Sequence, residues 1–366
     1  LEELIILQTA LAASPEDARA AYYLGNFLYD RRRHREAIPR WEQSAGQDPS
    51  FSVVWRNLGI AYFNVLGNAE AAREAFNKAR QANPADARVL YERDQLWKRI
   101  GESPARRLAE LERFPVPVGL RDDLTVELAS LYNQTRQHEK ARMLIDSRKF
   151  QPWEGGEGLA LGQHVRTHLA LGRCAMAQGD PAQARRFFEA ALDCPENLGE
   201  ARHLLANRSD IYYWLGVAYD AAGDLVNAHT WWERAAKYKG DFQEMSARSF
   251  SEMTYYNALA LKRLNRVIEA EEILRSLLAY AEQLMEQEAG IDYFATSLPA
   301  MLLFEDDLEK RNTVTATFLQ AQARIGLGDS QKARQLINQL LQLDPNHSLA
   351  SDLLAELEFR TVAIHT

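Results

Sequence analysis

The sequence contains few cysteines, no excess of positive charge and no long apolar run. Its two cysteines, Cys174 and Cys194, are too few for a disulfide scaffold, so we expect two free thiols and a cytoplasmic protein. The 51 acidic residues outnumber the 43 basic ones, giving a net charge of -8, which argues against a nucleic-acid partner. No apolar stretch is long enough to cross a bilayer, and we expect no membrane partner.

Sequence signals of catalysis are also missing. No phosphate-binding loop, nucleophile elbow or Cys-x-x-Cys pair occurs, so the sequence predicts no catalytic residue and no cofactor. His164 and His168 stand four residues apart, a spacing at which two imidazoles can hold one metal ion. No third ligand is evident, and the residues between them lack the glutamate of a zinc-protease helix. We therefore predict surface or packing histidines and no metal site.

One pattern recurs along the chain, most clearly in Trp55-Arg56-Asn57-Leu58-Gly59-Ile60-Ala61-Tyr62. One helical face collects Trp55, Leu58, Gly59 and Tyr62, and the same spacing returns in Ala72, Phe76 and Ala79 before Pro84 ends the run. This predicts two paired helices, in which small residues permit a close approach and aromatic residues fill the adjoining space. Leu24 precedes Leu58 by 34 residues, the period of tetratricopeptide repeats, which this pattern resembles.

The repeats predict an all-α fold, a right-handed tetratricopeptide superhelical solenoid of about eight helix-turn-helix units. Residues 1–115 hold regular units, the first of them truncated, because residues 3–13 resemble a second helix without its first. After a proline-rich interruption, residues 116–366 hold elongated units, and the fourth to the seventh unit are spaced by 42 to 44 residues. We expect insertions at 150–160, 196–210 and 285–311, and a helix over 348–358 that caps the array.

Several motifs together resemble one bacterial family more closely than a generic repeat. They are Tyr22-Tyr23-Leu24-Gly25-Asn26-Phe27-Leu28-Tyr29-Asp30, the Trp55 stretch, Arg121-Asp122-Asp123-Leu124, Pro152-Trp153-Glu154-Gly155-Gly156-Glu157-Gly158 and Ile291-Asp292-Tyr293-Phe294. In that family a β-sandwich region, similar to carbohydrate-active mutarotase-like domains, precedes a tetratricopeptide array. The resemblance covers almost the whole chain. It implies a fragment of a larger cytoplasmic protein that acts on or senses sugars, and it supplies no catalytic residues.

The inner face of the array is the predicted partner-binding surface. The first helix of each unit lines the groove of such arrays, and residues opposite the packing positions point inward. Tyrosine, arginine and asparagine combine apolar area with directional hydrogen bonds. The predicted groove residues are Tyr22, Asn26, Tyr29, Arg56, Phe63, Asn64, Asn133, Arg173, Tyr213 and Tyr255. For Tyr22 and Tyr213, each beside another aromatic residue, the alternative is support of a neighbouring helix.

A glycine-rich segment and an acidic cluster form a second candidate site. A tryptophan beside carboxylates can stack on a sugar ring and accept hydrogen bonds from its hydroxyls. The candidate sugar contacts are therefore Trp153, Glu154, Glu157 and Asp292. The structural alternative is that Trp153 fills a gap between units while Glu157 caps the next helix. The cluster Asp292, Glu305, Asp306 and Asp307 could act as general acid and base, or form a solvated acidic face.

We interpret the chain as a non-catalytic scaffold that binds a protein or peptide, or another domain of the same polypeptide, in its groove. The alternative is a helical accessory region of a carbohydrate-active enzyme, which would lend loop residues to a sugar site. Trp153 separates the two hypotheses. A buried Trp153 with exposed groove aromatics favours the scaffold, whereas an exposed Trp153 in one pocket with Glu154, Glu157 and Asp292 favours the enzyme.

Overall fold

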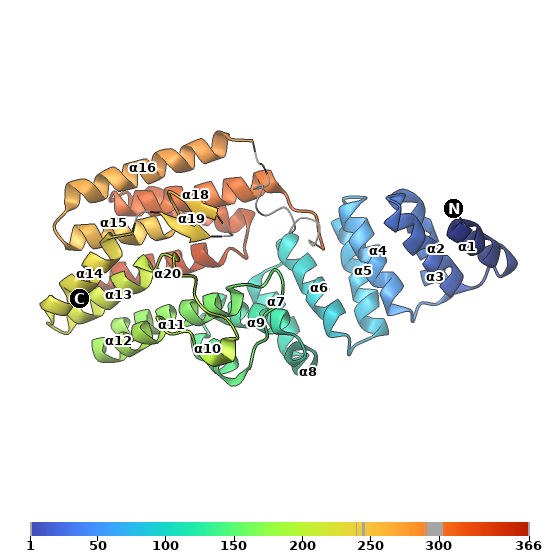
Figure 1. Ribbon diagram of the computed structural model, residues 1–366, viewed down its shortest axis with the longest axis horizontal. Coiled ribbons are helices and arrows are strands. Elements are labelled where there is room, and N and C mark those ends of the chain that lie inside the picture. The colour runs from blue at the N-terminus through green and yellow to red at the C-terminus, as the bar shows by residue number, and fades with distance from the viewer. Residues whose placement is uncertain (1, 239, 244–245, 289, 291–302, 365–366) are drawn as a thin grey trace. The chain divides into compact units, whose positions relative to one another are not determined.

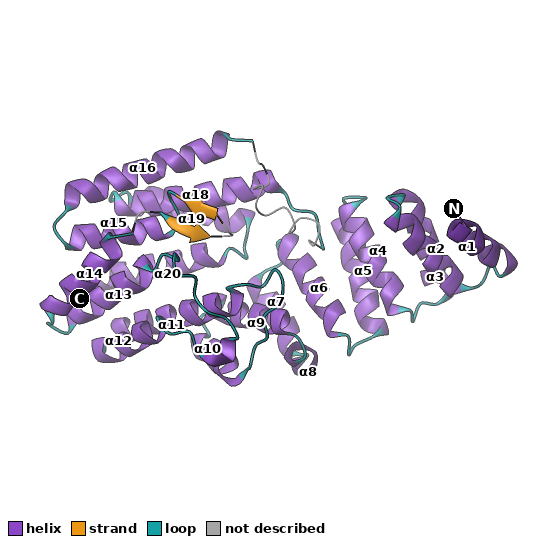
Figure 2. Cartoon of the chain, viewed as in Figure 1, coloured by secondary structure: helices purple, strands orange, loops and turns teal. Residues whose placement is uncertain are grey.

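The computed structural model describes residues 2–238, 240–243, 246–288, 290 and 303–364. Most of these residues lie in helices, so the predicted all-α fold is confirmed (Figure 2). Within these ranges the only strands are β1 (Asp241–Gln243) and β2 (Ser246–Arg248), an antiparallel hairpin that the sequence patterns did not predict. No helix in the described ranges is both long enough and apolar enough to cross a membrane.

The chain divides into two compact units. Unit 1 comprises Leu1–Glu102, Ala109–Leu124 and Met301–Asp306, whereas unit 2 comprises Ser103–Leu108, Thr125–Ala300 and Asp307–Thr366. The predicted division into residues 1–115 and 116–366 stays a prediction. A short stretch from far along the sequence, ending at Asp306, therefore belongs to the first unit.

Unit 1 is built of paired helices (Figure 1). They are α1 (Glu2–Ala13), α2 (Ala18–Asp30), α3 (His34–Gln47), α4 (Ser52–Asn64), α5 (Ala69–Ala82), α6 (Ala87–Arg99) and the short α8 (Pro115–Gly119). Helices α2 and α3 form one hairpin, and α4 and α5 form the next. Side-chain caps start several of these helices. Asp17, for example, accepts a hydrogen bond of 2.8 Å from the backbone N–H of Arg19, which satisfies a donor that has no partner within the helix.

Unit 2 continues the same plan with longer connections. Its described helices are α10 (His138–Ser147), α11 (Leu159–Ala177), α12 (Pro181–Ala190), α13 (Ser209–Ala221), α14 (Leu225–Ala236), α15 (Met253–Arg263), α16 (Val267–Glu286), α18 (Leu308–Gly326), α19 (Ser330–Leu343) and α20 (Ser348–Ile364). A 3-10 turn, η1 (Glu196–Leu198), lies between α12 and α13. Helices α7 (Pro104–Glu112) and α9 (Asp122–Gln134) contribute residues to both units. Cys174 and Cys194 are exposed free thiols, as predicted.

The same contact joins the two helices of four hairpins. A glycine on the first helix lies directly under an aromatic ring of the second, in the pairs Gly25 with Trp41, Gly59 with Phe76, Gly172 with Phe188 and Gly216 with Trp232. A methyl group on Gly59 would come within 2.5 Å of the Phe76 ring, closer than real carbon atoms approach. The rings are buried, so glycine is required here for close approach of the helices.

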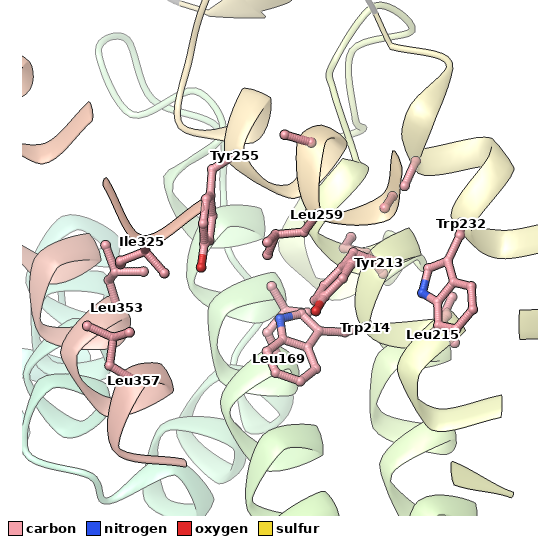
Figure 3. Close-up of a cluster of buried hydrophobic side chains, with 14 of the residues drawn as sticks. Leu169, Tyr213, Trp214, Leu215, Trp232, Tyr255, Leu259, Ile325, Leu353 and Leu357 are labelled. Carbon is pink, nitrogen blue, oxygen red and sulfur yellow. The ribbon is translucent and has the colours of Figure 1, made fainter. Parts of the chain in front are cut away.

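A large apolar cluster forms the core of unit 2 (Figure 3). It includes the aromatic residues Tyr213, Trp214 and Tyr255, all at most 5% exposed. The closing helix α20 adds Leu353 and Leu357, which Figure 3 shows on the same side of the cluster as Ile325 of α18. The predicted capping helix therefore covers an apolar face, and it extends six residues beyond the predicted end at 358.

We predict that Gly59→Ala destabilises unit 1 by about 1–3 kcal/mol, because the added methyl group overpacks the contact with Phe76. Gly46→Ala in α3 is the matched control. Its methyl group would meet nothing within 4 Å, so this variant should gain about 0.5 kcal/mol from helix propensity. Urea unfolding followed by circular dichroism measures both changes. Equal stability of the two variants would contradict the proposed role of the glycine contact.

Candidate functional site

Helices α2 and α4 carry the six groove residues predicted in unit 1, and all six are half-buried. Three of them line one cavity of about 320 Å³, namely Asn26, Tyr29 and Arg56. Its remaining lining comes from Asp30, Trp41, Asn57 and Ile60. Tyr22 does not line this cavity, because its ring packs edge-on against Phe51 with the centroids 4.8 Å apart. The register projection therefore brought half of these residues together in one site.

A chain of hydrogen bonds fixes the polar wall of this cavity. The amide oxygen of Asn26 accepts from the indole N–H of Trp41 at 3.0 Å and from the amide of Asn57 at 3.2 Å. Arg56 donates to Asn57 at 3.1 Å and makes two bonds of 2.6 Å to the carboxylate of Glu92. The Glu92 side chain is only 5% exposed, so the arginine neutralises a buried carboxylate. Arg56 thus shapes the wall and already has an anionic partner.

Tyr29 supplies an aromatic wall and a hydrogen-bond donor. Its ring stacks on His34, with a centroid distance of 4.2 Å, and lies 5.0 Å from the ring of Trp41. Burial raises the pKa of the Tyr29 hydroxyl, the charge of Glu305 raises it further, and Arg56 partly opposes both. The hydroxyl therefore stays protonated at neutral pH and can donate a hydrogen bond.

The two remaining groove residues of unit 1 hold a short segment of the same chain. The amide of Asn64 donates to the carbonyl oxygen of Leu303 at 3.0 Å, and its oxygen accepts from the backbone N–H of Glu305 at 3.0 Å. Phe304 between them is 1% exposed. Its ring meets those of Phe63 and Phe76 edge-on, at centroid distances of 5.2 and 5.9 Å.

Arg99 of α6 fixes the end of this segment. It donates to the carbonyl oxygen of Glu305 at 3.2 Å and to the carboxylate of Asp306 at 2.9 Å. We call residues 303–306 the inserted segment. Asp307, the next residue, caps α18 by accepting from the backbone N–H of Lys310 at 2.9 Å. Asp306 and Asp307 thus have structural roles, because Asp306 pairs with Arg99 and Asp307 caps α18. Acid-base chemistry is not needed to account for carboxylates at these positions.

In unit 2, two of the four predicted groove residues line cavities and the two tyrosines do not. Asn133 and Arg173 line a cavity of about 540 Å³ beside α20, and Arg173 also lines a second cavity of about 300 Å³. Tyr213 and Tyr255 are 5% and 0% exposed, so the expectation that their rings line an open groove does not hold. Both rings pack inside the apolar core, because α13 and α15 are covered on more than one side.

The polar groups of the larger cavity are held by the chain itself. Asn133 donates to the hydroxyl of Thr167 at 2.8 Å, and its oxygen lies 3.1 Å from Nδ1 of His138. Burial lowers the pKa of His138 to about 4, and Arg173 and Arg166 lower it while Asp352 opposes them. The imidazole is therefore neutral at pH 7 and donates through Nδ1 to Asn133.

The glycine-rich segment anchors a loop. Trp153 is half-buried and covers Gly156, where a methyl group would collide with the indole ring. The cap of α11 is Glu200, whose carboxylate accepts 2.6 Å bonds from the N–H groups of Gly158 and Leu161. This corrects the alternative in which Glu157 caps that helix. Glu154 and Glu157 are exposed and line none of the three cavities described here, and Asp292 lies outside the described residues.

The two histidines of α11 are packing residues bonded to the backbone. Nε2 of His164 lies 2.9 Å from the carbonyl oxygen of Ala190, and Nδ1 of His168 lies 2.8 Å from that of His164. Burial lowers the pKa of both imidazoles. In each ring, one nitrogen therefore donates a hydrogen bond to a backbone carbonyl oxygen. Among the described residues, no cluster of three or more His, Cys, Asp or Glu side chains is arranged to hold a metal ion.

Several site residues were missed by sequence reasoning. Asn57 and Trp41 line the unit 1 cavity, and Asn57 could have been found because it adjoins the predicted Arg56. Phe304 lay in an insertion, so no repeat register pointed to it. Asp352 gave no signal either, since α20 was expected only to cover the end of the array.

We predict that unit 2 loses stability as the pH falls from about 6.5 towards 4, in part because of His138. The unfolded histidine binds a proton near its ordinary pKa of 6.5, whereas the folded one does so only near 4, so acid favours the unfolded state. His138→Asn keeps a donor for Asn133 and should flatten the fall in Tm across this window. His229→Asn, on the exposed face of α14, is the control. Parallel Tm profiles for wild type and His138→Asn would refute this assignment.

Comparison with known proteins supports the repeat assignment. Models of the tetratricopeptide repeat match residues 6–50, 28–87, 165–190, 211–234 and 315–347. The type IV pilus assembly protein PilF of Pseudomonas aeruginosa is 35% identical over 106 residues, which span 28% of this chain and 41% of PilF. The chain thus matches less than half the length of this curated relative.

Solved structures match parts of this chain at low identity. YrrB, a tetratricopeptide protein described as having an unusual peptide-binding site, is 14% identical over 61% of this chain and 95% of its own, with a TM-score of 0.37. The Naa15/Naa10 complex bound to HypK-THB is 14% identical over 94% of this chain and 61% of its own, with a TM-score of 0.41. The stretches that match these repeat models occur in both units, and there the paired helices are similar to tetratricopeptide repeats.

Proposed function

We propose that this protein is a non-catalytic scaffold whose unit 1 groove binds an extended peptide segment with an aromatic side chain. The observation that carries the proposal is the inserted segment, which Asn64 holds by two backbone hydrogen bonds while Phe304 is buried. Asn64 bonds only to main-chain atoms, so it can hold any extended segment. The aromatic side chain then selects among them.

The energetics of these contacts suit an exchangeable ligand. Burying a phenylalanine side chain contributes roughly 1.5–3 kcal/mol, and edge-on packing against two rings adds to that. Each backbone hydrogen bond contributes about 1 kcal/mol net, because the unbound groups bond to water. The sum is modest, so a partner segment with the same groups can replace the inserted segment.

The adjoining cavity extends the site beyond a single aromatic residue. Asn64, which holds the segment, lies one helical turn beyond Ile60 of the cavity wall on α4, so the segment passes close to the cavity that Asn26, Tyr29 and Arg56 line. A side chain next to the aromatic anchor would enter a space of about 320 Å³ with a phenol donor on its wall. We infer that the preferred partner carries an aromatic residue followed by hydrogen-bond acceptors.

Several finer expectations belong to this proposal. The partner is another protein or a further domain of the same polypeptide, and the similarity to a protein named for pilus assembly supports an interaction role. A cytoplasmic location and origin in a larger bacterial protein stay predictions. A sugar-binding accessory role also stays a prediction, and the half-buried position of Trp153 over Gly156 gives it little support.

A peptide titration tests the groove directly. A fluorescein-labelled peptide of residues 301–307 should bind the full-length Phe304→Ala variant at least tenfold more tightly than the wild-type chain, because the variant's own segment has lost its anchor. Adding Asn64→Ala to that variant should weaken binding about tenfold through loss of both backbone bonds. Fluorescence anisotropy reports both affinities.

The controls separate binding from folding. Glu74→Ala, on the exposed face of α5, should leave peptide affinity unchanged. Arg56 is left intact, because its removal would take away one of the two arginine partners of the buried Glu92 carboxylate. Equal affinity with and without Asn64→Ala, or no saturable binding to the Phe304→Ala chain, would overturn the proposal.

A further inference from the structure

Helix α20 does more than close the repeat array. It packs against α19 and α11, two helices far apart in the sequence. Ala350, Leu353 and Leu357 lie in the apolar core of unit 2 (Figure 3), while its polar side chains face first helices of earlier hairpins. Helix α20 therefore lies as a ligand would, along the surface that first helices of tetratricopeptide hairpins present.

The polar contacts of α20 form a complementary charge pattern. Asp352 receives two bonds from Arg166 of α11, at 2.6 and 2.8 Å, in a bidentate pair whose side chains are 17% and 8% exposed. Glu356, one turn further, accepts from the hydroxyl of Tyr256 at 2.9 Å. Its carboxylate also lies 3.9 Å from Arg173. Basic groups of the groove thus meet acidic groups spaced along one helix.

A third carboxylate of α20 continues this charge pattern. Glu358 pairs with Arg136 at 2.7 Å, in the turn after α9, although both side chains are about half exposed. The amide of Gln134 donates to the carbonyl oxygen of Asn346, just before α20 begins, at 2.8 Å. The residue pair Asn346 and Glu358, one just before α20 and one within it, is therefore attached to the same region of unit 2.

Helix α20 does not fill the surface on which it lies. The cavity of about 300 Å³ lies beside its Leu349 and Leu353, and the cavity of about 540 Å³ lies beside its Ser351 and Ala355. Asp352 borders both. Both cavities are open to solvent on one side, and Ser351 and Ala355, which line the larger one, are small residues one turn apart. A helix with larger apolar residues at these two positions would bury more surface.

We propose that unit 2 contains a second docking groove, which binds an acidic amphipathic helix of a partner protein in place of α20. The partner helix would carry carboxylates at the positions of Asp352 and Glu356 and bulky apolar residues at those of Ser351 and Ala355. This inference does not depend on the proposed role of the inserted segment, because it concerns a different unit, a helical ligand and other residues.

Tethering sets the affinity that a partner must reach. A helix attached to its site has an effective concentration on the order of millimolar, so a partner at micromolar concentration must bind about a thousandfold more tightly than α20. Each buried methylene raises affinity about fourfold, so a few added carbon atoms in the larger cavity can supply that margin. Filling the cavity is therefore what distinguishes the partner from α20.

Two synthetic peptides of residues 346–358 test this proposal against the full-length chain. One has the natural sequence, and the other, the filled peptide, carries Ser351→Leu and Ala355→Leu. The filled peptide should bind the wild-type chain at least tenfold more tightly than the natural one, by fluorescence anisotropy. Amide exchange of α20 should rise at least tenfold when the filled peptide is bound. Equal affinities, or binding without faster exchange of α20, would overturn the proposal.

A charge exchange separates recognition from folding. Arg166→Glu in the chain should weaken binding of the filled peptide at least tenfold, and an Asp352→Lys filled peptide should restore it. Restored binding requires a folded groove, so the pair controls for misfolding. Arg186→Glu, on the exposed face of α12, should change nothing. Failure of the exchanged peptide to bind a chain whose circular dichroism is native would contradict charge recognition.

A variant of the chain itself provides an independent measurement. Ser351→Leu/Ala355→Leu in the full chain should raise Tm and abolish binding of the filled peptide, because α20 then occupies the cavity itself. A lowered Tm with unchanged peptide binding would overturn the proposed mode. Concentration-dependent dimerisation of the wild-type chain, reversed by the filled peptide, would identify a second copy as the occupant and overturn the assignment to a partner protein.

Discussion

The contact between a glycine and an aromatic ring determines how the hairpins of both units pack. In α4 and α5, Phe76 lies on the bare backbone at Gly59, so the two helix axes approach as closely as a ring allows. The Phe76 ring buries its area against this backbone and against apolar side chains that include Phe304. One face of the first helix is thereby buried against the second helix of its hairpin. The opposite face is left to bind something else.

In both units a segment of the same chain covers part of that opposite face. In unit 1 it is an extended stretch with one buried ring, Phe304, and in unit 2 it is the helix α20. Both segments lie late in the sequence. Covering an apolar face in this way avoids exposing a patch that would bind other proteins without selection. Each groove is therefore covered by a segment whose sequence is known.

The sequence predicted the hairpins well because their signal is local. Gly59 and Phe76 stand at fixed positions within one repeat, and helical periodicity places them on facing surfaces. The groove residues were predicted less well, because a register shows which face a residue occupies but not what covers it. Asn26 and Arg56 line a cavity, whereas Tyr255, on an equivalent projection, is fully buried.

Contacts between distant parts of the sequence could not be predicted from repeats at all. Glu200 caps a helix that begins 41 residues earlier, at Leu159, and the sequence pointed to Glu157 because it is adjacent. Phe304 and Asn64 are brought together across about two thirds of the chain. Neither pair shows periodicity. Such contacts depend on how the connections fold, which the hairpin pattern does not determine.

The two grooves differ in what they can discriminate. Asn64 bonds to main-chain atoms, so the groove that we propose in unit 1 would select mainly through the aromatic anchor. Arg166 is only 8% exposed, and a neutral helix in place of α20 would leave that buried cation unpaired, a cost of about 3–5 kcal/mol. That penalty exceeds the gain from most apolar contacts. Unit 2 should therefore reject neutral helices even when they fill its cavities. The charge pattern of a helix then affects its binding more than its shape does.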